Sequence, residues 1–293
     1  MVLKVEKSND RLDKFITNNT NHSRAIVNKL IAQGLVTVND EVKKASYQVK
    51  LGDVISVGDY EPPALDLQAE AMNLDIIYED DQLMVINKPS GLVVHPGNGH
   101  QEHTLVNGLI NYTNELSNLS GDFRLGIVHR LDKDTSGLML VAKTNGAHQF
   151  LTDGFKTKQI KRTYVALLDG VFPHETATID APIGRAANDR QQLTVTADNA
   201  KSALTQLKVL KRYENNTLVE LELATGRTHQ IRVHMKYIGY PVHNDPLYNK
   251  ASADAFGQFL HAKKLTFIHP VTKELMSFEC PLPKLFQDYL DNL

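Results

Sequence analysis

The residues of this 293-residue chain with the clearest capacity for chemistry lie in one short polar stretch, residues 129–137. Within it, Asp132 stands between Arg130 and Lys133. A carboxylate beside fixed cations stays ionised, and it can then serve as a nucleophile or as a base. Asp and Ser are also common in loops because they form turns, so this pattern alone leaves a structural role open.

Two hydrophobic segments flank this loop, and they are the elements that must position it. Residues 125–128 and 138–142 are short apolar runs, which predicts two buried strands. A loop between buried strands presents its side chains from a rigid frame, as reactive groups require. The sequence therefore predicts a candidate site in which Asp132 is held from both sides.

The string HRLDKDTSGLMLVAK, residues 129–143, resembles the signature of the RluA-type pseudouridine synthases, in which the Asp of HRLD is essential. Other segments resemble the remaining family motifs in the right order: 83–109 with NKPSG, 161–170 with KRTY, 223–248 with GRTHQIR, and 260–272 followed by CPLP. The likeness covers nearly all of residues 75–293. It implies that uridine is isomerised to pseudouridine, a reaction that requires neither a cofactor nor a metal.

The resemblance also implies roles for individual side chains. Asp132 would stabilise the positive charge that develops on the ribose when the glycosidic bond breaks. Arg232 would pair with Asp132 and keep it charged; Arg227 is the alternative partner, although we expect it on the RNA backbone. Tyr164 would stack on the uracil and provide a hydroxyl for proton transfer at C5.

A uracil in structured RNA must first be flipped out of its stack, which costs a few kcal/mol. Arg130 resembles the residue that fills the vacated space, and its planar guanidinium group suits stacking. His129 of the same element is expected to contact RNA. The chain departs from the family at Asn244-Asp245, where Gly-Asp is usual, but Asn is the best-tolerated replacement for Gly at positive φ.

The N-terminal residues predict a separate small module of two helices followed by strands. Apolar residues share one helical face over 11–18 and again over 24–33, and Gly34 suits the end of the second helix. Short strands follow at 35–38 and 53–57. The first of these strands leads into an Asn39-Asp40 turn.

This order resembles the S-four-type RNA-binding domain over residues 10–58. In that family the second helix and the turn before it contact RNA. The resemblance therefore implies RNA contacts by Ser23, Arg24 and Lys29, of which Ser23 also suits the N-cap of the helix.

Together these patterns predict an α+β protein with two domains. Residues 1–59 form the small α/β S-four-type domain, and 60–74 form an acidic linker that contains Pro62-Pro63. Residues 75–293 form the catalytic domain, with the pseudouridine-synthase fold of a mixed, largely antiparallel sheet and flanking helices.

The formal net charge of −2 at first argues against a nucleic-acid partner. This net charge, however, is the sum of segments with opposite charge. Residues 59–82 carry eight acids and no Lys or Arg, whereas residues 122–162 carry eight bases and four acids. Basic segments that gather around one cleft would attract phosphate. The charge distribution therefore allows an RNA partner. With its added S-four-type domain the chain most resembles the D-type members of the family, which modify large-subunit ribosomal RNA, and this resemblance implies that RNA, or its assembly precursor, as the partner, with no membrane and no nucleotide cofactor.

The single cysteine, Cys280, indicates a reducing cytoplasm, and nothing in the sequence predicts more than a monomer. Two other functions remain open. One is a non-catalytic RNA-binding factor in ribosome assembly. The other is a glycoside hydrolase that uses Asp132 and Asp134, although residues two apart in one loop are poorly placed to flank a substrate.

Overall fold

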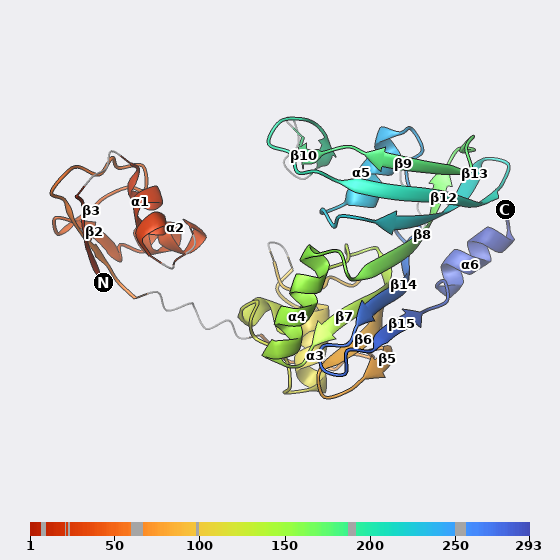
Figure 1. The fold of residues 1–293 in the computed structure, drawn as a ribbon, viewed down its shortest axis with the longest axis horizontal. Coiled ribbons are helices and arrows are strands. Elements are labelled where there is room, and N and C mark those ends of the chain that lie inside the picture. Colours follow the sequence, from red (N-terminus) through yellow and green to blue (C-terminus); the bar gives the residue numbers. More distant parts are fainter. Residues whose placement is uncertain are drawn as a thin grey trace. The chain divides into compact units, whose positions relative to one another are not determined.

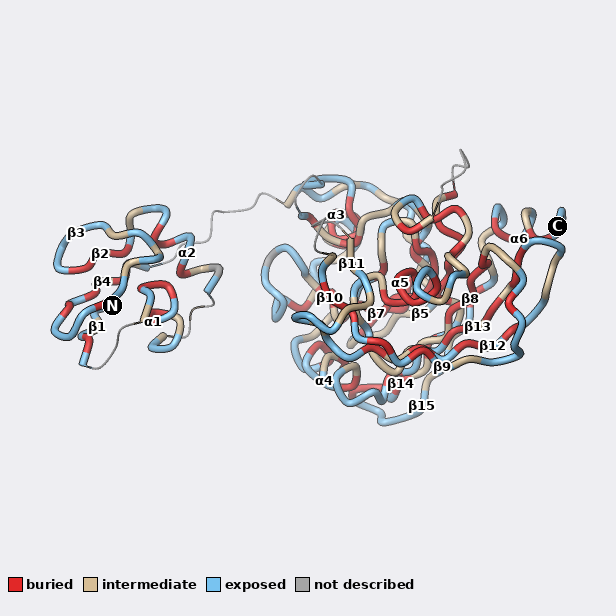
Figure 2. Tube along the Cα trace, turned by 90° about the horizontal axis from the view of Figure 1, so that it is seen from above, coloured by how far each residue is buried: buried red, intermediate tan, exposed pale blue. Residues whose placement is uncertain are grey.

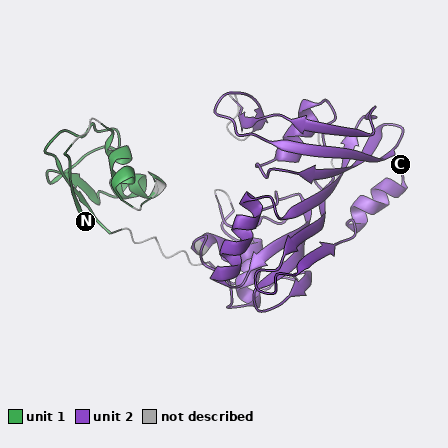
Figure 3. Ribbon diagram, in the orientation of Figure 1, with its two compact units in different colours: residues 1–65 green, residues 66–293 purple. Residues whose placement is uncertain are grey.

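The computed structural model describes residues 1–6, 10–20, 22, 24–59, 67–97, 100–186, 192–249 and 256–293. The chain forms two compact units, Met1–Leu65 and Asp66–Leu293 (Figure 3). Ser23, predicted to contact RNA, lies outside the described residues. No helix in the described part of the chain is both long enough and apolar enough to cross a membrane.

The smaller unit packs two helices on a four-stranded sheet with the strand order β1-β4-β2-β3. Its elements are β1 (Val2–Lys4), α1 (Leu12–Asn19), α2 (Arg24–Ala32), β2 (Val36–Val38), β3 (Glu41–Val42) and β4 (Val54–Val57). The apolar faces predicted from the spacing form its core, in which Leu12, Ile16 and Leu30 are fully buried. Asn39 and Asp40 both have positive φ, as the tight turn between β2 and β3 requires.

The larger unit is built on a nine-stranded sheet (Figure 1). Its strands are β5 (Ile76–Glu79), β6 (Leu83–Lys88), β7 (Ser136–Ala142), β8 (Lys161–Asp169), β9 (Thr176–Asp180), β12 (Leu204–Arg212), β13 (Asn216–Leu223), β14 (Leu260–Ile268) and β15 (Leu275–Glu279). The order is β5-β6-β7-β14-β8-β13-β12-β9, and β15 pairs with β14. Among the described strands only β7 and β14 pair in parallel, so the predicted mixed, largely antiparallel sheet is confirmed.

The remaining elements of the larger unit flank this sheet. They are α3 (Leu105–Tyr112), a 3-10 turn (Asp122–Arg124), α4 (Asn145–Lys156), the short pair β10 (Ile183–Arg185) and β11 (Leu193–Val195), α5 (Gln230–Tyr237) and α6 (Lys284–Asp291). The helix α4 packs against β7, whereas α5 packs against β11 and β12. The first six residues of α5, Gln230–Met235, are buried (Figure 2), so the polar side chains among them must find partners inside the protein.

The strand predicted over residues 125–128 is wrong. This segment follows the 3-10 turn, and only Ile127 forms an isolated bridge, to Val141. The cause is Gly126, whose φ of 71° turns the chain and whose missing side chain leaves room for Val141. The second predicted strand is present as β7.

The segment predicted as a linker, residues 60–74, has two parts. Residues 60–66 lie outside the described residues. From Leu67 onward the chain packs on the larger unit, where Leu67 and Leu74 contact its core and Asn107 Nδ2 donates to the Gln68 carbonyl at 2.8 Å. The larger unit thus includes residues that precede residue 75.

Candidate active site

The loop that carries Asp132 is fixed to the sheet by its own buried residues. Leu131 packs in the main hydrophobic core, and Thr135 accepts a hydrogen bond from Gln258 Nε2 at 2.6 Å. At Gly137, which has φ 112°, a Cβ would lie 2.3 Å from the Ala262 carbonyl oxygen. Only glycine therefore lets β7 approach β14 closely enough to pair at this point, directly after the loop.

A buried lysine holds the same loop from the other side. Lys88 ends β6, and its Nζ donates to three carbonyl oxygens, those of Pro89, Leu92 and Lys133, at 2.8–2.9 Å. The backbone N–H of Gly91 also donates to the Lys133 carbonyl at 3.0 Å. The NKPSG segment thus positions the residue that directly follows Asp132.

Asp132 itself is paired with Arg232 of α5. Arg232 Nη1 lies 2.8 Å from Asp132 Oδ2, and Nε and Nη2 of the same guanidinium group bind both carboxylate oxygens of Asp245 at 2.7 and 2.9 Å. Burial opposes the charge on Arg232, but the hydrogen bonds and charges of the two carboxylates raise its pKa. The arginine is therefore a permanent cation, and Asp132 keeps one oxygen free of it.

Asp245 is the fully buried anchor of this trio. Its Oδ1 also accepts the backbone N–H groups of Leu247 and Tyr248, at 2.9 and 3.0 Å. The preceding residue, Asn244, has φ 55° and donates from Nδ2 to the Gly257 carbonyl. The backbone thus has the positive φ for which the family's usual glycine is suited, and Asn supplies it together with an extra hydrogen bond.

His229, the N-cap of α5, lies on the other side of Asp132. Its Nε2 is 3.8 Å from Asp132 Oδ1, and its Nδ1 is 2.8 Å from the Tyr248 hydroxyl. That hydroxyl also accepts the Leu193 N–H at 3.0 Å. Tyr248 thus holds the imidazole ring so that Nε2 faces Asp132.

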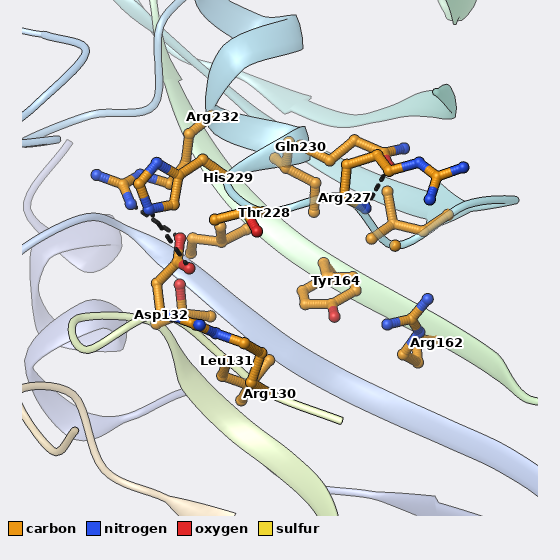
Figure 4. A pocket seen from close by; sticks show the side chains of 15 residues that line it. Arg130, Leu131, Asp132, Arg162, Tyr164, Arg227, Thr228, His229, Gln230 and Arg232 are labelled. Atoms are coloured by element: carbon orange, nitrogen blue, oxygen red, sulfur yellow. Dashed lines mark hydrogen bonds and ion pairs between the residues drawn. The ribbon is translucent and has the colours of Figure 1, made fainter. Parts of the chain in front are cut away.

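Tyr164 forms the wall of a cavity that opens beside Asp132 (Figure 4). It lies in β8, paired on either side with Leu221 of β13 and Ala262 of β14, and only 5% of it is exposed. Burial raises its pKa, so the hydroxyl stays protonated at neutral pH. A flat ring fixed in the centre of a sheet is a suitable surface for stacking a planar base.

The structure brings most of the predicted site residues to this cavity, but not all of them. Arg130, Arg227 and Arg232 line it together with Asp132 and Tyr164. Of the two candidate partners of Asp132, Arg232 makes the contact, whereas Arg227 Nε donates to the Ser202 carbonyl at 3.0 Å.

His129 is placed behind the loop instead of on the side where an RNA contact was expected. Its Nε2 accepts the Leu140 N–H at 2.9 Å, and its Nδ1 is buried. Burial, and secondly the charge of Arg162, lower its pKa to about 3, so the ring is neutral. His129 therefore supports the loop from the side opposite the cavity.

Asp134 is absent from the cavity lining. The glycoside-hydrolase alternative therefore lacks its second carboxylate there.

The predicted RNA-contacting residues of the smaller unit lie on or beside α2. Arg24 Nε and Nη2 bind Asp13 Oδ2 at 3.0 and 2.7 Å, and the arginine side chain is 60% exposed. Lys29 is also exposed. Their positions leave both side chains accessible to a partner of this unit.

Comparison with known proteins then identifies the larger unit. The family described as RNA pseudouridylate synthase matches residues 82–237, and the S4 domain matches residues 10–55. The chain belongs to the RNA pseudouridylate synthase family. Its members convert uridine to pseudouridine, so the rival functions of a non-catalytic RNA-binding protein and a glycoside hydrolase are not needed to explain the Asp132 site.

Individual relatives match this synthase over most of its length. A Bacillus subtilis protein named uncharacterized RNA pseudouridine synthase YlyB is 49% identical over 98% of this chain and 95% of its own. The ribosomal large subunit pseudouridine synthase D of Neisseria meningitidis serogroup B is 40% identical over 97% of this chain and 78% of its own. The structure of human RNA pseudouridylate synthase domain containing 1 aligns with a TM-score of 0.60 and 27% identity, over 76% of this chain and 86% of that chain.

Several residues that build the synthase site were not predicted from the sequence. They are the anchors Lys88 and Asp245, the flanking His229 and its partner Tyr248. Their signals were present within the matching motifs, in NKPSG, HNDPLY and GRTHQIR. These side chains were assigned no role from the sequence, because no step of the reaction required them. Each acts mainly through its contacts in the folded protein.

Proposed function

We propose that this synthase isomerises specific uridines of large-subunit ribosomal RNA to pseudouridine. The observation that carries the proposal is Asp132, which is ion-paired through Oδ2 with Arg232 and open to a cavity walled by Tyr164. The two relatives named ribosomal large subunit pseudouridine synthase D, from Neisseria meningitidis and Pseudomonas aeruginosa, support this class of RNA as the substrate.

In the proposed reaction the bond between uracil N1 and ribose C1′ breaks, the base turns, and C5 bonds to C1′. Asp132 stabilises the positive charge that develops on the sugar, through the oxygen that Arg232 leaves free. The proton released from C5 replaces the bond at N1, so the atoms balance without a redox partner or group donor. Arg232 compensates the charge of the carboxylate while substrate excludes water from it.

The cavity walls position the base for that turn. Tyr164 stacks on the flipped uracil, and its hydroxyl relays the proton that C5 loses by taking it up as it releases its own proton. Arg130, which is exposed at the rim, occupies the space that the base leaves in the RNA. Arg227 contacts the RNA backbone at the cavity mouth.

The smaller unit increases the affinity for RNA through Arg24 and Lys29, which both lie on α2. The protein acts as a monomer in this proposal. A single cysteine, Cys280, is consistent with action in the reducing cytoplasm, where ribosomal RNA is made.

Mapping pseudouridine in large-subunit ribosomal RNA tests this function. Unmodified RNA is incubated with the protein, treated with a carbodiimide and sequenced by reverse transcription, which stops at each modified pseudouridine. We expect stops at one or a few uridines. RNA that is bound tightly but stays unmodified would instead identify a non-catalytic assembly factor.

A further inference from the structure

Arg162 is a cation of the cavity to which the reaction above gives no task. It precedes Tyr164 by two residues in β8, so both side chains point to the same face of the sheet, and both line the cavity. No carboxylate in the described part of the chain lies within ion-pair distance of it, and its buried Nε has no hydrogen-bond acceptor there. A half-buried charge in this state lacks the counter-ion that proteins usually provide.

The neighbours of Arg162 hold the guanidinium group in place without neutralising it. Its Cζ lies 5.1 Å from the ring centroid of Phe155, a distance typical of a cation–π contact. On another side is Gly226, where a Cβ would lie only 2.9 Å from Nη2 and 3.2 Å from Nη1. His129, below it, is neutral and does not repel it. The group is thus held by uncharged contacts, which include a hydrogen bond with the Tyr164 hydroxyl, and its remaining N–H donors face the cavity.

This end of the cavity is strongly positive. Asp132 is the only acidic residue that lines it in the described part of the chain, and that carboxylate is already paired with Arg232. In Figure 4, Tyr164 lies between this pair and the guanidinium groups of Arg162 and Arg227. A guanidinium group that is held against an aromatic ring presents its N–H edge, which matches the oxygens of a phosphate.

We propose that Arg162 binds a backbone phosphodiester of the RNA next to the flipped uridine, in a subsite on the far side of Tyr164 from Asp132. The inference rests on the proposed function and adds a residue that fixes where the nucleotide sits. Phosphate contacts hold the register of a nucleic acid on a protein. Arg162 therefore positions the uridine over Tyr164, and Gly226 leaves the room that this arginine needs.

The test is the salt dependence of RNA binding by an Arg162→Gln variant. The probe is a fluorescein-labelled fragment of large-subunit ribosomal RNA, chosen because the wild-type protein forms pseudouridine in it. Every protein in the binding assay also carries Asp132→Asn, so that the RNA stays unmodified. We expect Arg162→Gln to weaken binding about tenfold and to reduce the slope of log K against log salt by about 0.7–0.9, the value for one phosphate contact.

Three matched variants separate a phosphate contact from a structural role. Lys161→Gln removes the same charge from the neighbouring residue, which points to the other face of β8, and should leave the slope unchanged. Arg162→Lys should keep most of the slope but lower kcat/KM, because a point charge replaces the planar group. Gly226→Ala keeps every charge yet displaces the guanidinium group, so it should weaken binding several-fold.

A slope unchanged in Arg162→Gln would overturn the inference, even if activity fell, because the arginine would then act only on Tyr164 or on the fold. Equal weakening by Lys161→Gln would also overturn it, since the effect would then be one of general charge. Failure of the proposed function is distinct: it would be a wild-type protein that forms pseudouridine in no large-subunit fragment.

Discussion

Each unit of this synthase contains a carboxylate bound by arginine, and the two clusters are arranged in opposite ways. In the smaller unit Asp13 is 1% exposed, whereas its partners Arg11 and Arg24 are 47% and 60% exposed. In the larger unit Arg232 is the buried member at 6%, while Asp132 is 18% exposed and faces the cavity.

The difference shows which member of an ion pair is left available for a partner. Asp13 is buried in the smaller unit, where it binds Arg11 and Arg24. These two arginines stay accessible at the surface, as an RNA-binding domain requires. In the larger unit the second carboxylate, Asp245, fixes the arginine, and Asp132 is left partly free for substrate. The proposed function accordingly assigns RNA binding to the exposed arginine in one unit and chemistry to the exposed carboxylate in the other.

Removing the central arginine should have the largest effect. Arg232→Ala leaves the charges of Asp132 and Asp245 facing each other without a cation, and we expect pseudouridine formation to fall about 10³-fold. Stability should also fall, by about 3–5 kcal/mol, because a buried charge loses its partner. Single-turnover assays and chemical unfolding measure the two effects.

The matched control is Arg212→Ala, which removes an arginine that binds Glu175 and donates to the carbonyl oxygens of Phe172 and His174, away from the cavity. It should lower stability by about 1–3 kcal/mol, because these hydrogen bonds are lost, and leave the rate unaltered. An Arg232→Ala protein that keeps a tenth of the wild-type rate would contradict the role assigned to the buried cation.

Loosening the anchor should have a smaller effect than removing the arginine. Asp245→Asn keeps an oxygen for the N–H groups of Leu247 and Tyr248 but loses one charged hydrogen bond to Arg232. We expect kcat to fall about 10–100-fold, the equivalent of one such bond, with KM for RNA nearly unchanged. A larger change in KM than in kcat would show instead that Asp245 serves RNA binding.

The corresponding change in the smaller unit should affect stability and not chemistry. Hydrogen bonds from Arg11 lower the pKa of Asp13 to about 2, against the opposing effect of burial and with help from Arg24. Because the folded pKa lies below the unfolded one, this stabilisation is present above about pH 4 and is lost as the pH falls through about 2. It amounts to at most about 2 kcal/mol.

We therefore expect Asp13→Asn to destabilise the smaller unit at pH 7 and to make its unfolding less sensitive to acid. Methyl NMR signals of the buried residues Ile16 and Leu30 measure this in the full chain. The rate of pseudouridine formation at saturating RNA should not change. A loss of rate similar to that of Asp245→Asn would mean that the two clusters do not have separate tasks.

Much of the fold could be predicted because its signals are local. The helices around Leu12 and Leu30, the Asn39-Asp40 turn and the strand after Gly137 each follow from the periodicity or backbone preferences of a few neighbouring residues. The strand expected before the loop is absent for a reason that is also local, since the positive φ of Gly126 interrupts the extended backbone and leaves only the isolated bridge from Ile127 to Val141.

The site was less predictable because its contacts are distant in sequence. Asp132 and its partner Arg232 are 100 residues apart, and the resemblance to a family, not spacing, indicated the pair. Asp245 and Lys88 gave no independent signal, since a buried ion pair or a lysine that binds carbonyl groups is recognisable only once the chain has folded. His129 shows the reverse case, in which a residue of the catalytic motif turns inward to support it.

The central claim is that Asp132 performs the chemistry from its pair with Arg232. The most direct test is single-turnover pseudouridine formation by Asp132→Asn in a large-subunit ribosomal RNA fragment, beside a binding measurement on the same RNA. We predict an RNA affinity within about threefold of that of the wild-type protein, because Asp132 is assigned no contact with an RNA phosphate. We predict that the rate falls at least about 10³-fold. An Asp132→Asn protein that binds equally well and modifies the same uridine within tenfold of the wild-type rate would contradict the account.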